Sequence, residues 1–400
     1  MKTSEDRILV SHAGSLIKPP KVIEQLQAKD FGEPVNEEQL DHDVTEAVKA
    51  VVKKQREVGV DVPDDGEMGK TIWTGYQMER LTGIEAKPPT GVPAGIPLGA
   101  GEPQFAEFWE QYRSHEATLW MWPDVRVQDR TPPALEVGYT TAGPIKYKGQ
   151  ELIQRDIANL KAALHDVPHE DAFLPVVAPA SAELMDLEGH YKTEEELLYG
   201  IADALNEEYR AIVDAGLLVQ LDDCLIVWMY NVIQDIPAYR KWAELRVEAT
   251  NQALKGIPPE KVRYHVCWGS QNSPHVTDVP LKEVVDILMK LNVQAYSIEA
   301  ANPRHEHEWM LWEEFKLPEG KVLIPGIVTH STSVVEHPEL VAWRLKNFAS
   351  VVGRENVIAG TDCGFCQAWW AIRVHPTVQW AKLEALAEGA ALASKDLWRK

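Results

Sequence analysis

The chain has 400 residues, of which 45% are hydrophobic and 25% are charged, as is ordinary for a globular protein. Its formal net charge of -21 argues against nucleic-acid binding, which requires a basic surface, and no apolar run is long enough to span a membrane. The four cysteines are too few for a disulfide scaffold and are expected to be free thiols or metal ligands. Because the N-terminus lacks the apolar segment of a secretion signal, we expect a cytoplasmic protein.

Short apolar runs alternate with helix-like segments along most of the chain. The runs are rich in β-branched and aromatic residues, which favour strands, and the segments between them repeat apolar residues at helical spacing. The predicted strands are residues 8–10, 60–62, 173–178, 217–221, 261–266, 293–298, 322–328 and 357–359. Eight strands alternating with helices are typical of a (β/α)8 barrel, so we predict an α/β fold, a TIM barrel forming one domain over residues 1–400.

Several of the predicted helices carry start and stop signals. Asn36, with Gln39 three residues later, is typical of a capping box, and Gly59 ends that helix. Thr193 precedes three glutamates and caps a long helix that ends near Gly216. Further helices are predicted over residues 151–164, 280–291, 338–352 and 378–393.

One stretch, residues 85–148, interrupts the alternation. Residues 87–103 are rich in Pro and Gly, and residues 105–122 are rich in aromatic side chains. We interpret residues 85–135 as an insertion that folds over one end of the barrel as a lid. Residues 137–147 are predicted to form a hairpin with Gly143 and Pro144 at its turn.

Polar residues that are rare in buried parallel strands gather at the predicted strand ends. In a TIM barrel the C-terminal ends of the strands meet at one face, where active sites form. Buried charge at such positions needs a partner or a metal. The residues concerned are Ser15, Glu67, Asp222, His265, Cys267, Glu299, His330 and Cys363.

Four of these residues have the chemistry of a zinc site. His265 and Cys267 are two apart on one strand and therefore face the same way. With Glu299 and Cys363 they supply one imidazole, two thiolates and one carboxylate, a set that suits tetrahedral zinc. Because the three negative charges outweigh Zn²⁺, such a zinc is better suited to activating a substrate thiol than to making hydroxide.

Two other clusters offer weaker alternatives. Cys363 and Cys366 form a C-x-x-C pair that could be a redox motif, although no thioredoxin-like context surrounds it. The run from His305 to Glu308 is expected to be a solvated helix start rather than a metal site.

The polar motifs resemble, in their order, those of the cobalamin-independent methionine synthase family. The match is to the catalytic barrel of that family and covers the chain apart from the insertion. The motifs are HAGS (12–15), GE (66–67), QLDD (220–223), HVC (265–267), SIEA (297–300), the histidine at 330 and DCG (362–364). The resemblance implies a zinc-dependent methyltransferase acting on homocysteine with a 5-methyltetrahydrofolate-type donor.

The resemblance also implies a role for each polar residue. Glu67 and Asp222 are expected to bind the amino group of homocysteine, and Ser15 with its turn is expected to bind the carboxylate. His330 is expected to be the acid that assists the leaving methyl donor. The four candidate ligands named above are expected to hold the zinc. One departure is that Asp223, Cys224 and Leu225 replace the family's Glu-Pro-Ala.

Three alternatives remain open. The first is an alkyltransferase acting on another thiol such as coenzyme M, similar to the epoxyalkane:coenzyme M transferases, with Lys70 or Arg304 binding the sulfonate. The second is a barrel that stores or senses zinc, which would not need Glu67 or His330 at the same face. The third is a metal-free decarboxylase, which would have no use for two convergent cysteines. Small molecules, rather than nucleic acid or membrane, are the expected partners in every case.

Overall fold

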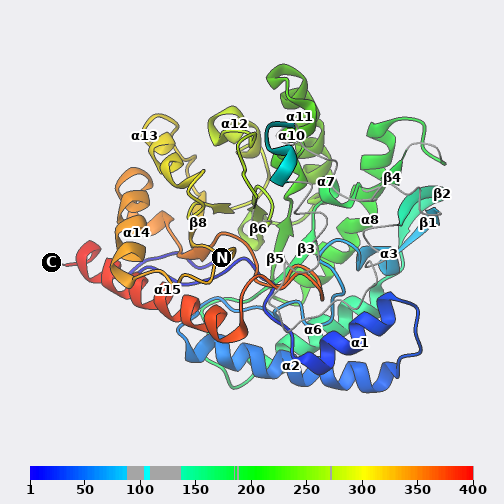
Figure 1. Cartoon of the computed structure of the whole chain (residues 1–400), viewed down its shortest axis with the longest axis horizontal. Coiled ribbons are helices and arrows are strands. Elements are labelled where there is room, and N and C mark those ends of the chain that lie inside the picture. The colour runs from blue at the N-terminus through cyan, green and yellow to red at the C-terminus, as the bar shows by residue number, and fades with distance from the viewer. Residues whose placement is uncertain (88–102, 109–136, 184, 187–188, 271–272, 400) are drawn as a thin grey trace.

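A computed structural model describes the chain except for residues 88–102, 109–136, 184, 187–188, 271–272 and 400. Its centre is a parallel sheet of six strands in the order β3-β5-β6-β7-β8-β9. These strands are β3 (Phe173–Val177), β5 (Leu218–Asp222), β6 (Val262–Val266), β7 (Ala295–Glu299), β8 (Val322–Val328) and β9 (Gly360–Thr361). The sheet curls, and helices lie around its outside (Figure 1). The mixed α/β class is therefore confirmed.

The two segments predicted as the first and second strands form only isolated bridges. Val10 bridges Ala359 and Asp64 bridges Phe173, both in parallel orientation. The backbone N–H groups of Asp61 and Val62 donate to the carbonyl of Val10 at 2.9 and 3.1 Å. The segments around Val10 and Val62 thus connect the two edges of the sheet. A complete eight-stranded barrel stays a prediction.

Seven longer helices account for most of the helical residues described. They are α1 (Pro20–Asp30), α2 (Glu37–Glu57), α6 (Gln150–Leu164), α8 (Glu194–Asp214), α11 (Ile236–Ala253), α14 (Pro338–Val352) and α15 (Pro376–Leu397). The predicted caps are confirmed, because Asn36 accepts from the N–H of Gln39 at 3.1 Å and Thr193 accepts from that of Glu196 at 3.1 Å. No described helix is both long and apolar enough to cross a membrane.

Short helices complete the connections. They are α3 (Gln77–Arg80), η1 (Pro103–Phe105), α7 (Pro179–Ala182), α9 (Leu225–Trp228), α10 (Tyr230–Ile233), η3 (Pro259–Lys261), η4 (Leu281–Glu283), α12 (Val285–Leu288), η5 (Glu306–Met310), α13 (Leu311–Glu314) and η6 (Arg354–Asn356). The prediction of one continuous helix over 280–291 was wrong, because it is divided into η4 and α12. At the junction, Val284 has φ −135° and ψ −16° and leaves the helical region.

The predicted hairpin over 137–147 was also wrong. Residues Gly138–Tyr147 form one strand, β2, which pairs antiparallel with β1 (Leu81–Lys87) and parallel with β4 (Met185–Asp186). Gly143 and Pro144 lie opposite Gly83, where the register shifts, instead of forming a turn. The partner strand thus precedes the insertion. The proposed lid lies mostly outside the described residues.

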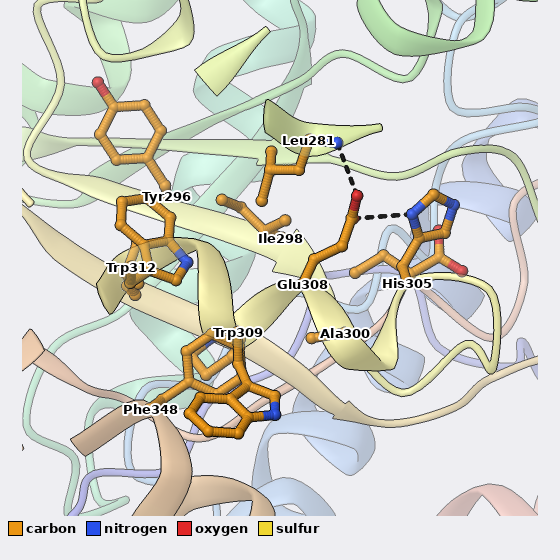
Figure 2. Close-up of a pocket in the computed structure, with 12 residues that line it drawn as sticks. Leu281, Tyr296, Ile298, Ala300, His305, Glu308, Trp309, Trp312 and Phe348 are labelled. Atoms are coloured by element: carbon orange, nitrogen blue, oxygen red, sulfur yellow. Dashed lines mark hydrogen bonds and ion pairs between the residues drawn. The ribbon is translucent and has the colours of Figure 1, made fainter. Parts of the chain in front are cut away.

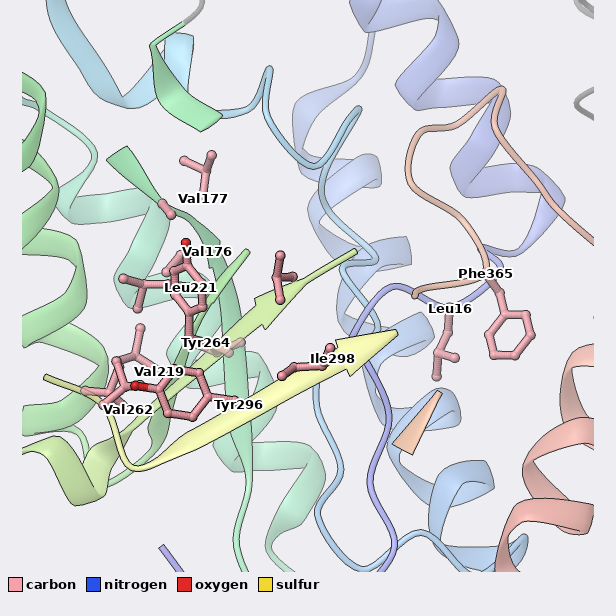
Figure 3. Close-up of a cluster of buried hydrophobic side chains, with 14 of the residues drawn as sticks. Leu16, Val176, Val177, Val219, Leu221, Val262, Tyr264, Tyr296, Ile298 and Phe365 are labelled. Carbon is pink, nitrogen blue, oxygen red and sulfur yellow. The ribbon is translucent and has the colours of Figure 1, made fainter. Parts of the chain in front are cut away.

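Alternation along the parallel strands separates two packing faces. The side chains of Val219, Leu221, Tyr264 and Tyr296 belong to the large core between the sheet and the helices, and Figure 3 shows them on β5, β6 and β7. Small separate clusters, such as Leu9 with Ala295 and Ile324, fill the opposite, inner face. Because side chains two apart share a face, the polar residues at the strand ends continue this inner face.

Candidate metal centre

The end of β6 brings two predicted ligands to the inner face. His265 and Cys267 are both buried, at 4% and 3% exposure, and they meet Cys363, which follows β9. One ligand atom from each of the three residues lies within 4.8 Å of the other two. We call His265, Cys267 and Cys363 the ligand trio. The predicted convergence of these three side chains from distant parts of the sequence is confirmed.

His265 is oriented for metal binding. Its Nδ1 lies 3.1 Å from the hydroxyl oxygen of Ser297 on the neighbouring strand β7. Its Nε2 is buried and has no hydrogen-bond partner among the described residues. An orphaned buried ring nitrogen is costly, whereas a metal ligand needs that nitrogen unprotonated, with the other nitrogen held by an outer partner. The trio therefore fits a metal ion.

The two thiols are close together and share polar neighbours. Their sulfur atoms are 3.6 Å apart, and Cys363 Sγ accepts from the hydroxyl of Ser270 at 3.2 Å and from the amide of Gln367 at 3.8 Å. The pKa of each thiol lies well above its ordinary value, mainly because of the neighbouring thiol: Cys224 for Cys267, and Cys267 for Cys363. A bound cation reverses this effect, because a coordinating thiol is deprotonated.

Glu299, the fourth predicted ligand, lies beside the trio and is not one of its members. Its Oε2 accepts from the backbone N–H of Trp268 at 2.9 Å, and its Oε1 accepts from the amide of Asn302 at 3.0 Å. Burial raises the pKa of this carboxyl, and the nearby His275 and His305 oppose that shift. Its role as a ligand stays a prediction.

A second group of charged residues, Glu67, Asp222 and Lys70, is buried on the same inner face. Glu67 adopts a left-handed φ of 55°, which is uncommon for a residue other than glycine and is often found at functional sites. Lys70 Nζ lies 3.9 Å from Glu67 Oε2. The pKa of Asp222 is raised well above its ordinary value, first by burial and then by the charge of Glu67, while Lys70 opposes the shift. A cationic group bound here would relieve this repulsion.

Ser15 connects the two groups. Its backbone carbonyl accepts from Phe365 N–H at 2.8 Å, and Leu16 N–H donates to the carbonyl of Gly66 at 3.1 Å. A Cβ atom on Gly364 would lie 2.0 Å from Ser15 Oγ, so the serine packs directly against the residue after Cys363. Ser15 thus stands between the Glu67 loop and the ligand trio.

Comparisons with known proteins find similar sequences over most of the chain. The family model described as "Cobalamin-independent synthase, Catalytic domain" matches residues 189–382. A methionine synthase of Sulfolobus acidocaldarius is 22% identical over 97% of this chain and 92% of its own length. The uncharacterized protein YxjH of Bacillus subtilis is 24% identical over 97% of this chain and 94% of its own length.

A solved structure has a similar fold. The B12-independent methionine synthase from Shewanella sp. W3-18-1, in complex with selenomethionine, superposes with a TM-score of 0.70 at 20% identity and covers 98% of this chain and 99% of its own. The predicted resemblance to the cobalamin-independent synthase family is confirmed. The residues matched by the synthase model include the ligand trio, Asp222, Glu299 and His330. Ser15 and Glu67 lie outside that span.

His330, the predicted acid, is fully enclosed. It is 1% exposed, and neither ring nitrogen has a hydrogen-bond partner among the described residues. Burial, followed by the charges of Arg373 and His265, lowers its pKa well below the ordinary value. The ring is therefore neutral at pH 7 in this state. A role as acid stays a prediction, and it requires that a proton reach the ring when the donor is bound.

The expectation that residues 305–308 are solvated was wrong for His305. This ring is 3% exposed, stacks on Trp268 at a centroid distance of 4.0 Å, and lies 2.9 Å from carboxylate oxygens of both Asp278 and Glu308. These carboxylates outweigh the effect of burial and raise its pKa to about 9. Figure 2 shows His305 and Glu308 at the edge of an apolar pocket between the sheet and α13. No member of the ligand trio lines this pocket.

Two residues near the trio were missed by the sequence reasoning. Ser297 could have been found, because it lies two residues before Glu299 on the same face of a strand. Cys224 could not have been found in this way. It follows the end of β5, where the alternation of a strand no longer determines the side on which a side chain lies. It is buried in one cluster with Cys267 and Cys363.

Ser297 provides a test of the trio as a metal site. Replacing it with alanine removes the outer partner of His265, so metal affinity should fall about 10–100-fold. Competition with a chromophoric chelator measures this. Ser350→Ala is the matched control, because Ser350 is exposed on α14 and bonds only the carbonyl of Asn347 in the same helix. Equal affinities for the two variants would contradict the assignment.

Proposed function

We propose that this protein transfers a methyl group to the thiol of homocysteine and so produces methionine. The observation that carries the proposal is the buried ligand trio with its unpaired imidazole nitrogen, which lies on the same inner face as the acidic pair Glu67 and Asp222. Similarity to the synthase family supports the same reaction, since relatives matched along nearly their whole length are named methionine synthases.

Zinc is the metal that the trio favours. One imidazole and two thiolates are typical zinc ligands, and soft sulfur donors disfavour Mg²⁺ and Ca²⁺. Glu299 is the fourth ligand that the sequence predicts. When bound, zinc would lower the pKa of the acceptor thiol and keep it as a nucleophilic thiolate near neutral pH. The enclosed setting of Cys267 and Cys363 would keep water away from that thiolate.

The amino-acid end of the acceptor would bind at Glu67 and Asp222. Two carboxylates buried together repel each other, and the ammonium of homocysteine would neutralise that repulsion. Lys70 lies 3.9 Å from Glu67 and also donates to the carbonyl of Pro175 at 2.6 Å, so it would balance one of the charges in the free protein. Ser15 with its turn would bind the acceptor's carboxylate. Binding at this end would place the thiol within the trio, because both groups share one inner face.

A 5-methyltetrahydrofolate-type molecule is the proposed methyl donor. A tertiary amine leaves poorly unless it is protonated, so the donor needs an acid close to its leaving nitrogen. His330 is the proposed acid. Because its pKa is lowered by burial in the free protein, the proton would have to arrive with the donor.

One observation favours a second candidate, alkyl transfer to a thiol such as coenzyme M. Lys70 is buried beside Glu67 and could pair with a sulfonate. Arg304 is a poorer choice, because its guanidinium donates to the carbonyl of Val276 on an exposed loop. Only the acceptor's charged end differs between the two candidates.

The proposed function also rests on a barrel architecture within one domain. The bridges at Val10 and Asp64 support the inference that these segments are the first two strands of a (β/α)8 barrel. Residues 85–148 would then be an insertion into one domain of residues 1–400. Strand ends that meet at one face would account for the position of every proposed site residue.

The zinc assignment predicts the behaviour of two cysteine variants. Cys267→Ser and Cys363→Ser should each lose most of the bound zinc and the formation of methionine from homocysteine, because each removes a thiolate. Metal analysis and a methyl-transfer assay measure both effects. Cys366→Ser is the control, since the thiol of Cys366 donates to the carbonyl of Ala368 instead. Full zinc retention in both serine variants would refute the site.

The acceptor assignment predicts that Glu67→Gln and Asp222→Asn raise KM for homocysteine. Each loses a charge-assisted hydrogen bond worth about 1.5–3 kcal/mol, so KM should rise roughly tenfold or more. Steady-state kinetics measure this, with Glu57→Gln on the exposed end of α2 as the control. An unchanged KM, or turnover of coenzyme M in place of homocysteine, would favour the second candidate.

The His330 assignment predicts that His330→Asn retains zinc and acceptor binding but lowers kcat by about 10²–10⁴. Acceptor binding and single-turnover methyl transfer are measured on one preparation. His307→Asn is the control, because His307 is exposed on η5. Joint loss of binding and transfer would make His330 a structural residue, and normal transfer would remove it from the mechanism.

A further inference from the structure

A tryptophan lies against the thiols of the metal centre. Trp73 packs on the buried cluster formed by Cys224, Cys267 and Cys363. These three cysteines are at most 8% exposed, whereas Trp73 is only partly buried. The indole therefore lies between the thiols and the surface of the protein, where a molecule that approaches the sulfur atoms would meet it.

The backbone at Trp73 is fastened to the loop that follows Cys363. The N–H of Trp73 donates to the carbonyl of Gln367 at 2.9 Å, and the N–H of Trp369 donates to the carbonyl of Thr71 at 2.9 Å. The side-chain amide of Gln367 in turn donates to Cys363 Sγ at 3.8 Å. These contacts fix the position of the indole relative to the ligand trio.

The loop that carries Trp73 also carries part of the proposed acceptor site. Glu67 and Lys70 precede the tryptophan in this loop and are buried, at 3% and 7% exposure. Lys70 Nζ donates to the carbonyl of Pro175 at 2.6 Å and lies 4.3 Å from the centroid of the Tyr76 ring, so the loop is anchored on both sides of Trp73. The sulfur end of an acceptor held at Glu67 would therefore lie beside the indole.

We propose that Trp73 restricts the group transferred to the acceptor sulfur to methyl, because the indole fills the space that a larger alkyl group would need. This inference rests on the proposed function, since it concerns the acceptor bound there. A tryptophan side chain is large and rigid, and protein interiors pack so closely that one added carbon is felt. The sulfur of a methyl thioether also makes favourable contacts with aromatic rings, so the methylated product fits beside the indole.

The geometry of the transfer explains why a side chain beside the sulfur can select by size. The acceptor thiolate forms a bond to the carbon as the bond between that carbon and the donor nitrogen breaks. The electron pair of the broken bond stays on the nitrogen, which takes up a proton. The hydrogens of a methyl group project sideways from the line through these three atoms. In an ethyl group a second carbon replaces one of the hydrogens, and it would press against the indole.

The test compares the binding of L-methionine and L-ethionine to the full-length protein loaded with zinc, by isothermal titration calorimetry. Wild type should bind methionine about 10–200-fold more tightly than ethionine. Trp73→Ala should bring this ratio close to one, and Trp73→Phe should give an intermediate ratio. Trp343→Ala is the matched control and should keep the wild-type ratio, because Trp343 is 50% exposed on α14. A loss of stability alone would weaken both ligands together and leave the ratio unchanged.

The possible failures can be told apart. If wild type shows no preference for methionine, or if both Trp73 variants keep the wild-type ratio, the role of Trp73 is refuted, and bound zinc with turnover of homocysteine would leave the methyltransferase intact. Wild type that binds neither zinc nor homocysteine would overturn the proposed function and this inference together. Because Trp73→Phe keeps an aromatic ring on the thiols, the ratio can be measured even where Trp73→Ala does not fold.

Discussion

The arrangement of the site depends on the alternation of side chains along buried parallel strands. On β6, Tyr264 and Val266 face the outer core, so Arg263, His265 and Cys267 must face inward. The same rule places Gln220 with Asp222 on β5, and Ser297 with Glu299 on β7. A register slip of one residue would move every one of these polar groups into the apolar layer. The large outer core thus fixes the inner face on which the polar groups meet.

Polar groups on this inner face must be paired, and the pairing also holds the N-terminal loop in place. Arg263 donates to Ser11 Oγ and to the carbonyl of His12 at 2.8 and 3.0 Å. Gln220 donates to the carbonyl of Ala13 and to Asp222. The side chains below the site therefore fix the loop that carries Ser15. Buried amides and guanidinium groups rigidify a structure when they are satisfied in this way, so one network serves both the fold and the site.

The sequence predicted strands β3, β5, β6, β7 and β8 and the ligand trio because both follow from local rules. The last strand was misplaced, since residues 357–359 were predicted and β9 is Gly360–Thr361. Strand β6 could be recognised from its composition, and period two then placed His265 beside Cys267. The strand content of the N-terminal segments was overestimated, since Val10 and Asp64 form only isolated bridges. The pairing of β2 with β1 could not be predicted, because the partner lies before a long insertion. The burial of His305 was missed, because it depends on Asp278 and Trp268, which lie far away in sequence and carry no periodic signal.

The surroundings of Glu299 show that neighbouring residues, as well as the type of ligand, determine the charge and the position of a carboxylate beside the ligand trio. His305 is cationic at neutral pH between Asp278 and Glu308 and stacks on Trp268, whose own N–H holds Glu299. His275 and His305 both favour the charged form of that carboxyl. These histidines oppose the effect of burial, which raises the pKa of Glu299. The hydrogen bonds from Trp268 and Asn302 hold this carboxylate beside the ligand trio, and they leave a lone pair on each oxygen with which it could bind a metal.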